Sequence, residues 1–126
     1  MTTVDFNEPN LSNKLEELTD AERHELPFGV VKLDDKGIVT FFSTTEARQS
    51  GYESRPAVGH DFFLNIAPCM GTPEFKGRVD QARKLGTVDI EMGWVGDFDD
   101  PNGEMVIRIQ SASDGGLWIC LNREED

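Results

Sequence analysis

Two residues in this chain, Cys69 and Glu46, have side chains that could react or exchange a proton rather than only pack in a core. Cys69 is expected in a loop that follows the apolar pair Phe62-Phe63. A thiol in a loop beside apolar residues can be activated or covalently modified. A cysteine is also often a small buried hydrophobe. Its position alone leaves both interpretations open.

The carboxyl group of Glu46 also has two interpretations. Glu46 stands three residues after Ser43, the spacing of a capping box at a helix start, which requires no further function. Alternatively, the carboxyl group faces the core with no cation beside it. Burial would then raise its pKa and keep it protonated, as a hydrogen-bond donor.

Other chemistry has little support in the sequence. The chain has only His24 and His60, and it has no CxxC or HExxH spacing for a metal ion. It has no phosphate-binding loop and no GxSxG motif. Cys120 lies in the apolar run 117–121, as expected for a strand residue in a packed sheet. We therefore expect neither an enzyme nor a metal site.

Length and charge narrow the class of protein further. A chain of 126 residues suits one domain, which can bury a core without disulfides or metals. A net charge of −12 argues against nucleic acid or an anionic membrane as partner, and it suits either solubility or a high-salt cytoplasm. No apolar run approaches the roughly 18 residues of a membrane helix, and residues 1–9 lack signal-peptide features. We expect a cytoplasmic protein.

The elements that must position these residues fall into two parts. Residues 1–25 predict a short helical cap, with a capping box at Thr19–Glu22 and an apolar stripe at Leu11, Leu15 and Leu18. A segment this short does not fold alone, so the cap must lie on residues 26–126.

Residues 26–126 predict strands and helices in a definite order. Strands are expected at 28–33 and 38–42, joined by a turn at Gly37, and then a short helix from Ser43 to Gly51. A longer helix should begin at Thr72-Pro73 and end at Gly86. Strands at 87–98, 104–111 and 117–121 complete the pattern. This order indicates an α+β fold with a five-stranded antiparallel sheet and helices on one face, the order of a PAS domain.

The segment 61–69, with Ala67-Pro68-Cys69, and the following 72–75 closely resemble the photoactive yellow protein family, and so does 26–29. The similarity extends over essentially the whole chain. It implies a PAS-fold blue-light photoreceptor for sensory transduction, in which a cysteine carries p-coumaric acid as a thioester. The family holds this chromophore as a buried phenolate, hydrogen-bonded by a tyrosine and a protonated glutamate. Light drives trans-to-cis isomerisation and proton transfer, and the cap becomes mobile.

The resemblance assigns roles by position. Cys69 matches the attachment site and Glu46 the proton donor. The residues that would line the chromophore pocket are Phe42, Ser50, Tyr52, Phe62, Ile66, Ala67, Pro68, Gly96 and Phe98.

The chain departs from the family pattern at several pocket positions. Phe42 replaces the tyrosine that binds the phenolate, Ser50 replaces a threonine, and Tyr52 replaces an arginine. Gly96 and Asp100 replace a phenylalanine and a loop methionine. Loss of the tyrosine removes one donor to the phenolate, which should raise the pKa of the chromophore. We therefore expect absorption to the red of the usual family member, and a protonated form that persists to higher pH.

Two other functions stay open. A PAS domain that has lost its chromophore would be an interaction module in signal transduction. The replaced pocket residues favour it, and the presence of both Cys69 and Glu46 opposes it. A thiol-based redox sensor would need a resolving cysteine or histidine near Cys69, which the sequence does not offer. The sequence does not name the downstream signalling protein; we expect a monomer.

Overall fold

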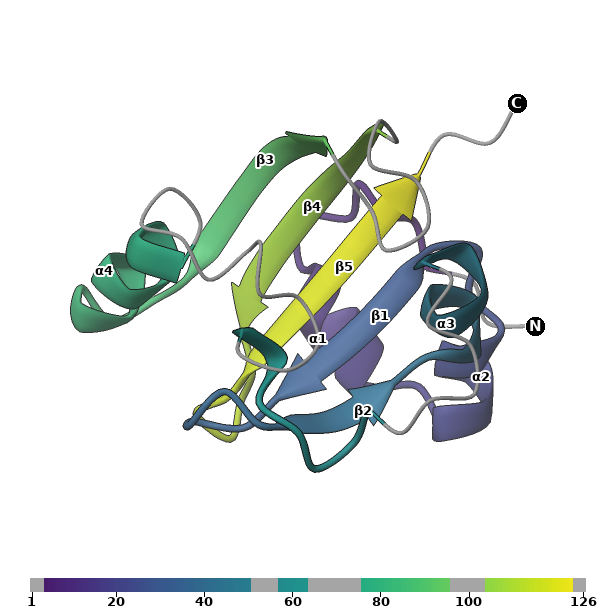
Figure 1. Ribbon diagram of the computed structural model, residues 1–126, viewed down its shortest axis with the longest axis horizontal. Helices are drawn as coiled ribbons and strands as arrows, with labels where there is room; N and C mark the ends of the chain where they lie inside the picture. Colours follow the sequence, from purple (N-terminus) through teal and green to yellow (C-terminus); the bar gives the residue numbers. More distant parts are fainter. Residues whose placement is uncertain (1–3, 51–56, 64–75, 96–103, 124–126) are drawn as a thin grey trace.

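Five strands form one antiparallel sheet in a computed structural model that describes residues 4–50, 57–63, 76–95 and 104–123 (Figure 1). Their order across the sheet is β2-β1-β5-β4-β3. The strands are β1 (Gly29–Leu33), β2 (Val39–Phe42), β3 (Asp89–Val95), β4 (Glu104–Ser111) and β5 (Leu117–Arg123). The prediction of an α+β fold with a five-stranded antiparallel sheet is confirmed.

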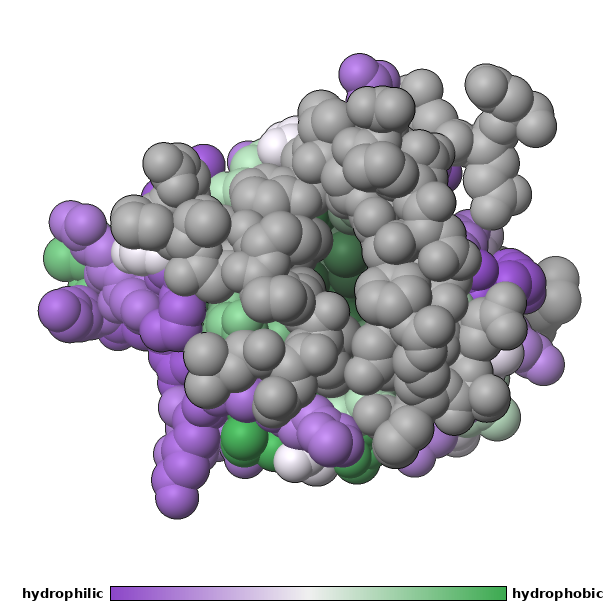
Figure 2. All heavy atoms as spheres, in the orientation of Figure 1, coloured by the Kyte–Doolittle hydropathy of each residue, from purple (hydrophilic) through white to green (hydrophobic). Residues whose placement is uncertain are grey.

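Among the described residues, four α-helices accompany the sheet: α1 (Leu11–Glu16), α2 (Asp20–His24), α3 (Thr44–Ser50) and α4 (Arg78–Lys84). The capping box at Thr19 is present, and Gly86 follows α4 with a φ of 112°. Hydrophilic side chains cover the end of the molecule where α4 lies (Figure 2). The predicted helix start at Thr72-Pro73 lies outside the described residues. No helix in the described part of the chain is long and apolar enough to span a membrane.

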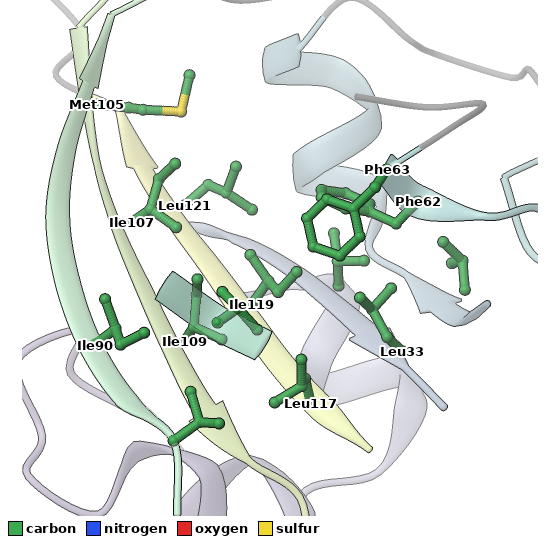
Figure 3. Packing of buried hydrophobic residues seen from close by; sticks show 14 residues of the cluster. Leu33, Phe62, Phe63, Ile90, Met105, Ile107, Ile109, Leu117, Ile119 and Leu121 are labelled. Carbon is green, nitrogen blue, oxygen red and sulfur yellow. The ribbon is translucent and has the colours of Figure 1, made fainter. Parts of the chain in front are cut away.

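The sheet buries apolar residues on both faces because its central strand alternates between them. Leu117, Ile119 and Leu121 of β5 belong to one cluster, which we call the main core (Figure 3). Its fully buried members also include Val31, Leu33, Ile107 and Ile109. Trp118 and Cys120 of the same strand belong to a second cluster, the cap core. Period-two alternation along the strand places the two sets on opposite faces.

The cap covers the face opposite α3. Leu11, Leu15 and Leu18 are buried in the cap core, and Figure 1 shows α1 behind the sheet with α3 in front of it. Polar side chains reinforce this docking. The buried Arg108 of β4 donates through Nη1 to the carbonyl oxygens of Phe6 at 2.6 Å and Glu8 at 2.8 Å.

A second polar contact is expected to make the docking of the cap sensitive to acid. Glu16 accepts hydrogen bonds from the Ser113 N–H at 2.9 Å and the Trp118 indole N–H at 3.1 Å. Burial raises the pKa of Glu16, but these hydrogen bonds outweigh it and bring the pKa below its ordinary value of 4.5. A carboxyl group with a lowered folded-state pKa stabilises the folded state above its unfolded pKa, and that contribution disappears as pH falls through the folded pKa.

Replacement of Glu16 by glutamine is therefore expected to weaken cap docking at neutral pH and to remove its acid sensitivity below about pH 4.5. The indole N–H resonance of Trp118, followed by NMR from pH 7 to pH 3, reports this contact directly. Glu17→Gln, at an exposed neighbouring position, is the matched control. An unchanged indole titration in the Glu16 variant would contradict the assignment.

Candidate functional site

Ser43 fixes the start of α3, the helix that carries Glu46. The buried Ser43 hydroxyl accepts the N–H of Glu46 at 3.1 Å and the N–H of Val30 at 3.0 Å. One half of the predicted capping box is therefore present. The backbone N–H of Ser43 donates to the Val30 carbonyl oxygen at 2.9 Å. These bonds attach the first turn of α3 to β1 and direct the Glu46 side chain inward.

The carboxylate of Glu46 binds the guanidinium group of Arg123, at the end of β5. Nη1 lies 2.6 Å from Oε1 and Nη2 lies 3.0 Å from Oε2, so the pair is bidentate. The side chains are 6% and 10% exposed, respectively. Of the two interpretations of Glu46, the second therefore lacked one element, because a cation does stand beside the buried carboxyl group. A guanidinium group in this geometry favours the ionised carboxylate.

Sequence reasoning missed Arg123 because it ended the last strand at Leu121. The strand continues for two more residues, and Arg123 pairs with Met105 of β4. Arg123 shares the period-two parity of Ile119 and Leu121, which face the main core. Continuing the alternation beyond Leu121 would have placed this cation on the face that α3 covers.

Gly29 leaves the space that the Glu46 carboxylate occupies. A Cβ atom at Gly29 would lie 2.0 Å from Oε1 of Glu46, far inside van der Waals contact. The first residue of β1 must therefore lack a side chain for this carboxylate to lie against the strand.

Gly29→Ala is expected to lower the free energy of unfolding by about 1–3 kcal/mol, because the new methyl group must displace the Glu46 carboxylate. Urea denaturation measures this. Gly93→Ala on β3 is the matched control, since a Cβ atom there meets no atom within 4 Å, and its expected effect is under about 0.5 kcal/mol. Equal effects at the two glycines would show that the carboxylate is not held against β1.

Aromatic side chains line the same face of the sheet. Phe42, the last residue of β2, is partly buried against the main core, and Phe62 is buried within it. The rings of Phe62 and Phe63 meet edge to face, with centroids 5.2 Å apart. Figure 3 shows this pair on the side of the sheet toward which Leu33 and Ile119 point. A buried carboxylate and an aromatic wall on one face suit a flat ligand with a polar end.

The other predicted site residues are less fully described. Ser50 is the last residue of α3. The predicted attachment residue, Cys69, lies outside the described residues, as do Tyr52, Ile66, Ala67, Pro68, Gly96 and Phe98. Asp100 does as well.

Alternative reactive groups are poorly placed among the described residues. Cys120 is buried in the cap core, and burial raises the pKa of its thiol far above the ordinary value. His24 accepts the backbone N–H of Thr44 through Nδ1 at 2.9 Å, and His60 is exposed. Within the part of the chain that the structure describes, no three His, Cys, Asp or Glu residues cluster as metal ligands would.

Comparisons with known proteins agree with this arrangement. No family model matches the chain. The photoactive yellow proteins of Rhodothalassium salexigens and Halochromatium salexigens are each 27% identical to it, over 98% of this chain and 99% of theirs. The PAS domain of an HTR-like protein from Haloarcula marismortui, at 13% identity and a TM-score of 0.53, shares the fold.

A further solved structure is similar in both sequence and fold. It is the photoactive yellow protein domain of the sensor histidine kinase Ppr from Rhodospirillum centenum, with a TM-score of 0.79 and 31% identity. The alignment covers 88% of this chain and 98% of that domain. The chain therefore belongs to the photoactive yellow protein family and has the PAS fold.

Proposed function

We propose that this protein is a blue-light photoreceptor that carries p-coumaric acid as a thioester on Cys69. Its family membership supports a PAS-type photosensor rather than an enzyme. The observation that carries the proposal is the buried Glu46 carboxylate, held on the sheet face that Phe42 and Phe62 line. We further propose that it acts in the cytoplasm, as a monomer, on a signalling protein.

The described residues fit such a chromophore. A hydroxycinnamoyl group is a flat apolar body with one oxygen at its far end. Phe42 and Phe62 would pack against the ring, and Glu46 would meet the oxygen. Attachment requires only acyl transfer, in which the Cys69 sulfur bonds to the carbonyl carbon of an activated p-coumaric acid. The activating group leaves, and the thiol's proton is released.

The bound group supplies a double bond that light converts from trans to cis. The protein's contribution lies in Glu46, which exchanges a hydrogen bond or a proton with the ring oxygen. Any change of charge on Glu46 also changes its attraction to Arg123, at the end of β5. Because β5 carries both core clusters, this pair would couple the light-sensitive face to the face under the cap.

The test is an absorption spectrum of the purified protein before and after activated p-coumaric acid is added. We expect a new absorption band that blue or near-ultraviolet light bleaches and that recovers in the dark. If no band appears and the mass of the protein does not increase, the pocket does not take this pigment. The chain would then be a PAS interaction module without a chromophore.

Phe42 offers a second test, because it stands where a hydroxyl group is expected from the resemblance. Restoring that group with Phe42→Tyr should lower the pKa of the chromophore and shift its visible band to the blue, since the phenolate gains a donor. A pH titration of the visible band measures both changes. Phe41→Tyr is the control, because Phe41 packs against the cap core on the opposite face. Equal shifts in both variants would count against a pocket at Phe42.

A further inference from the structure

We propose that His24 is a positioning residue that regulates the candidate site: its neutral imidazole fastens the first turn of α3 to the cap, and protonation of the ring releases that turn. This inference rests on the proposed function, because α3 carries Glu46, but its first test needs no pigment. His24 and Thr44 lie 20 positions apart, at the end of α2 and the start of α3. Figure 1 shows the two helices next to each other.

The His24 ring accepts a hydrogen bond that the start of α3 needs. The N–H groups in the first turn of a helix have no acceptor within that helix. The Ser43 hydroxyl is the acceptor for Glu46, and Nδ1 of His24 is the acceptor for Thr44, at 2.9 Å. The first turn of α3 is therefore held from two directions, by the residue before it and by a residue of the cap.

Only the neutral ring of His24 can make this contact. A neutral imidazole has one nitrogen with a free lone pair, whereas both nitrogens of an imidazolium carry hydrogens. Because Nδ1 accepts the Thr44 N–H, the neutral ring carries its hydrogen on Nε2. A second proton would go to Nδ1 and would oppose the Thr44 N–H. The protonated ring would retain only the Thr44 hydroxyl, 3.0 Å from Nδ1, and the N–H would lose its acceptor.

The elements packed against the ring offer no carboxylate to pair with its proton. β2 has no charged residue, and the Phe41 ring of this strand lies 4.8 Å from the imidazole, centroid to centroid. On α3, the Glu46 carboxyl group lies against Arg123, and Arg48 is exposed. Within the described ranges, none of the ion pairs includes His24.

The charged residues of α2 itself have other contacts. Arg23 donates to Asp20 at 2.6 Å, and the Glu22 carboxylate accepts the Thr19 N–H at 2.9 Å. Glu25, directly after the helix, is exposed. A proton on the His24 ring would therefore place a second cation next to Arg23, without an anion in contact with it.

Loss of the Thr44 contact would reach the candidate site over a short distance along α3. Thr44 stands two positions before Glu46, whose side chain would meet the ring oxygen of the pigment. Thr45 keeps a tie that does not depend on this proton, because its hydroxyl lies 3.1 Å from the His24 carbonyl oxygen and 2.6 Å from that of Leu26. Protonation should therefore loosen the first turn of α3 without detaching the cap.

The chemistry of imidazole sets the pH range of this regulation. An imidazole ordinarily changes charge between about pH 5 and pH 8. The neutral form makes the contact with Thr44, so the contact is present above this range and is lost as the pH falls through it. The acid sensitivity expected from Glu16 lies below about pH 4.5, so the two effects can be measured separately.

The first experiment follows the backbone amide of Thr44 by NMR in the protein without pigment. Its protection from solvent exchange, relative to the intrinsic rate at each pH, is compared at about pH 7.5 and about pH 5.5. In the wild type we expect protection to fall at least about fivefold, the effect of one lost hydrogen bond. In His24→Asn it should not fall, because the amide oxygen of the new side chain accepts at both pH values.

His60→Asn is the matched control, because it replaces the other histidine of the chain, at an exposed position. This variant should lose protection at Thr44 as the wild type is expected to. Equal protection at the two pH values in the wild type would overturn the proposal. A fall in protection that persists in His24→Asn would overturn it as well.

Two further variants identify the atoms that make the contact. His24→Phe keeps an aromatic ring against Phe41 but has no acceptor, so the Thr44 amide should be weakly protected at both pH values. Thr44→Val removes the hydroxyl group and keeps the N–H, so the fall in protection with acid should remain. Full protection in His24→Phe, or no fall in Thr44→Val, would contradict the assignment to Nδ1 and the N–H. Circular dichroism shows whether each variant is folded.

The second experiment loads the protein with activated p-coumaric acid and measures how fast the bleached band recovers in the dark. Recovery requires Glu46 to meet the ring oxygen again, so a loose first turn of α3 should slow it. At about pH 5.5 the wild type and His60→Asn should recover at least about threefold more slowly than His24→Asn, and near pH 8 all three should recover at similar rates. If the ratio of the rates does not change with pH, the contact does not regulate the site and the proposal is refuted.

Failure of the two ideas can be told apart. If no pigment binds, the photoreceptor function is wrong, while the exchange of the Thr44 amide still decides whether the His24 ring holds α3 in a proton-dependent way. If pigment binds and the protection of Thr44 does not follow pH, the function stands and the role of His24 falls.

Discussion

A chain with alanine in place of Cys69 is expected to bind no p-coumaric acid covalently and to show no pigment band. The thioester needs a sulfur nucleophile, and alanine offers none. The loss should be complete rather than partial, because the alternative thiol is inaccessible. Absorption spectra and intact-protein mass spectrometry, run after the same incubation with activated p-coumaric acid, measure the outcome.

Cys120→Ala is the matched control for this experiment. Cys120 is buried under the cap, and the raised pKa of its thiol leaves almost no reactive thiolate. This variant should therefore take up one equivalent of pigment, which is also the uptake expected of the wild type. Colour retained in Cys69→Ala and lost in Cys120→Ala would reverse the assignment of the attachment site. Far-ultraviolet circular dichroism shows whether each variant is folded.

Replacing Arg108 with methionine should release much of the cap from the sheet. The guanidinium group donates to two carbonyl oxygens of the cap, and methionine leaves both without this donor. Loss of charged hydrogen bonds at a buried position should lower the free energy of unfolding by about 3 kcal/mol. Urea denaturation gives the magnitude, and hydrogen exchange of residues 4–25 shows where the structure opens.

Arg83→Met tests whether the burial of Arg108 is the reason for the large loss of stability expected in Arg108→Met. Arg83 also donates to two carbonyl oxygens, those of Asp35 and Gly115, but it does so at the surface. Its replacement is expected to cost less than about 1 kcal/mol and to leave the amides of the cap protected. Equal losses in the two variants would contradict a specific role for Arg108 in holding the cap.

The sheet was largely predictable because the placement of apolar residues at every second position of a strand is a local property of the sequence. The predicted strand at 104–111 coincides with β4, in which Met105, Ile107 and Ile109 lie at every second position. The same pattern gave no warning that Arg108 and Gln110 are also buried. Their burial depends on the cap, whose contact with β4 joins residues about a hundred positions apart, as the hydrogen bond from Arg108 to Phe6 does.

The candidate site was predicted only in part, again because a sequence shows local patterns but not contacts between distant residues. Glu46 was identified from its spacing to Ser43 and from the resemblance, and both concern nearby residues or known motifs. Its partner Arg123 lies 77 positions away, and only the pairing of strands brings the two together. A charge environment is a tertiary property, so the ionisation state of Glu46 could not be inferred from the residues around it.

The sheet order also has a consequence for how this chain acquires its structure. β1 pairs with β5, Gly29 opposite Leu121, so the second and third strands of the sheet come from opposite ends of the described sequence. During synthesis, β1 leaves the ribosome long before its central neighbour exists, and α1 and α2 have no complete surface on which to dock. Such non-local pairing makes folding slow and strongly cooperative. The sheet face that carries Glu46 and the face under the cap should therefore form together, once β5 has been made.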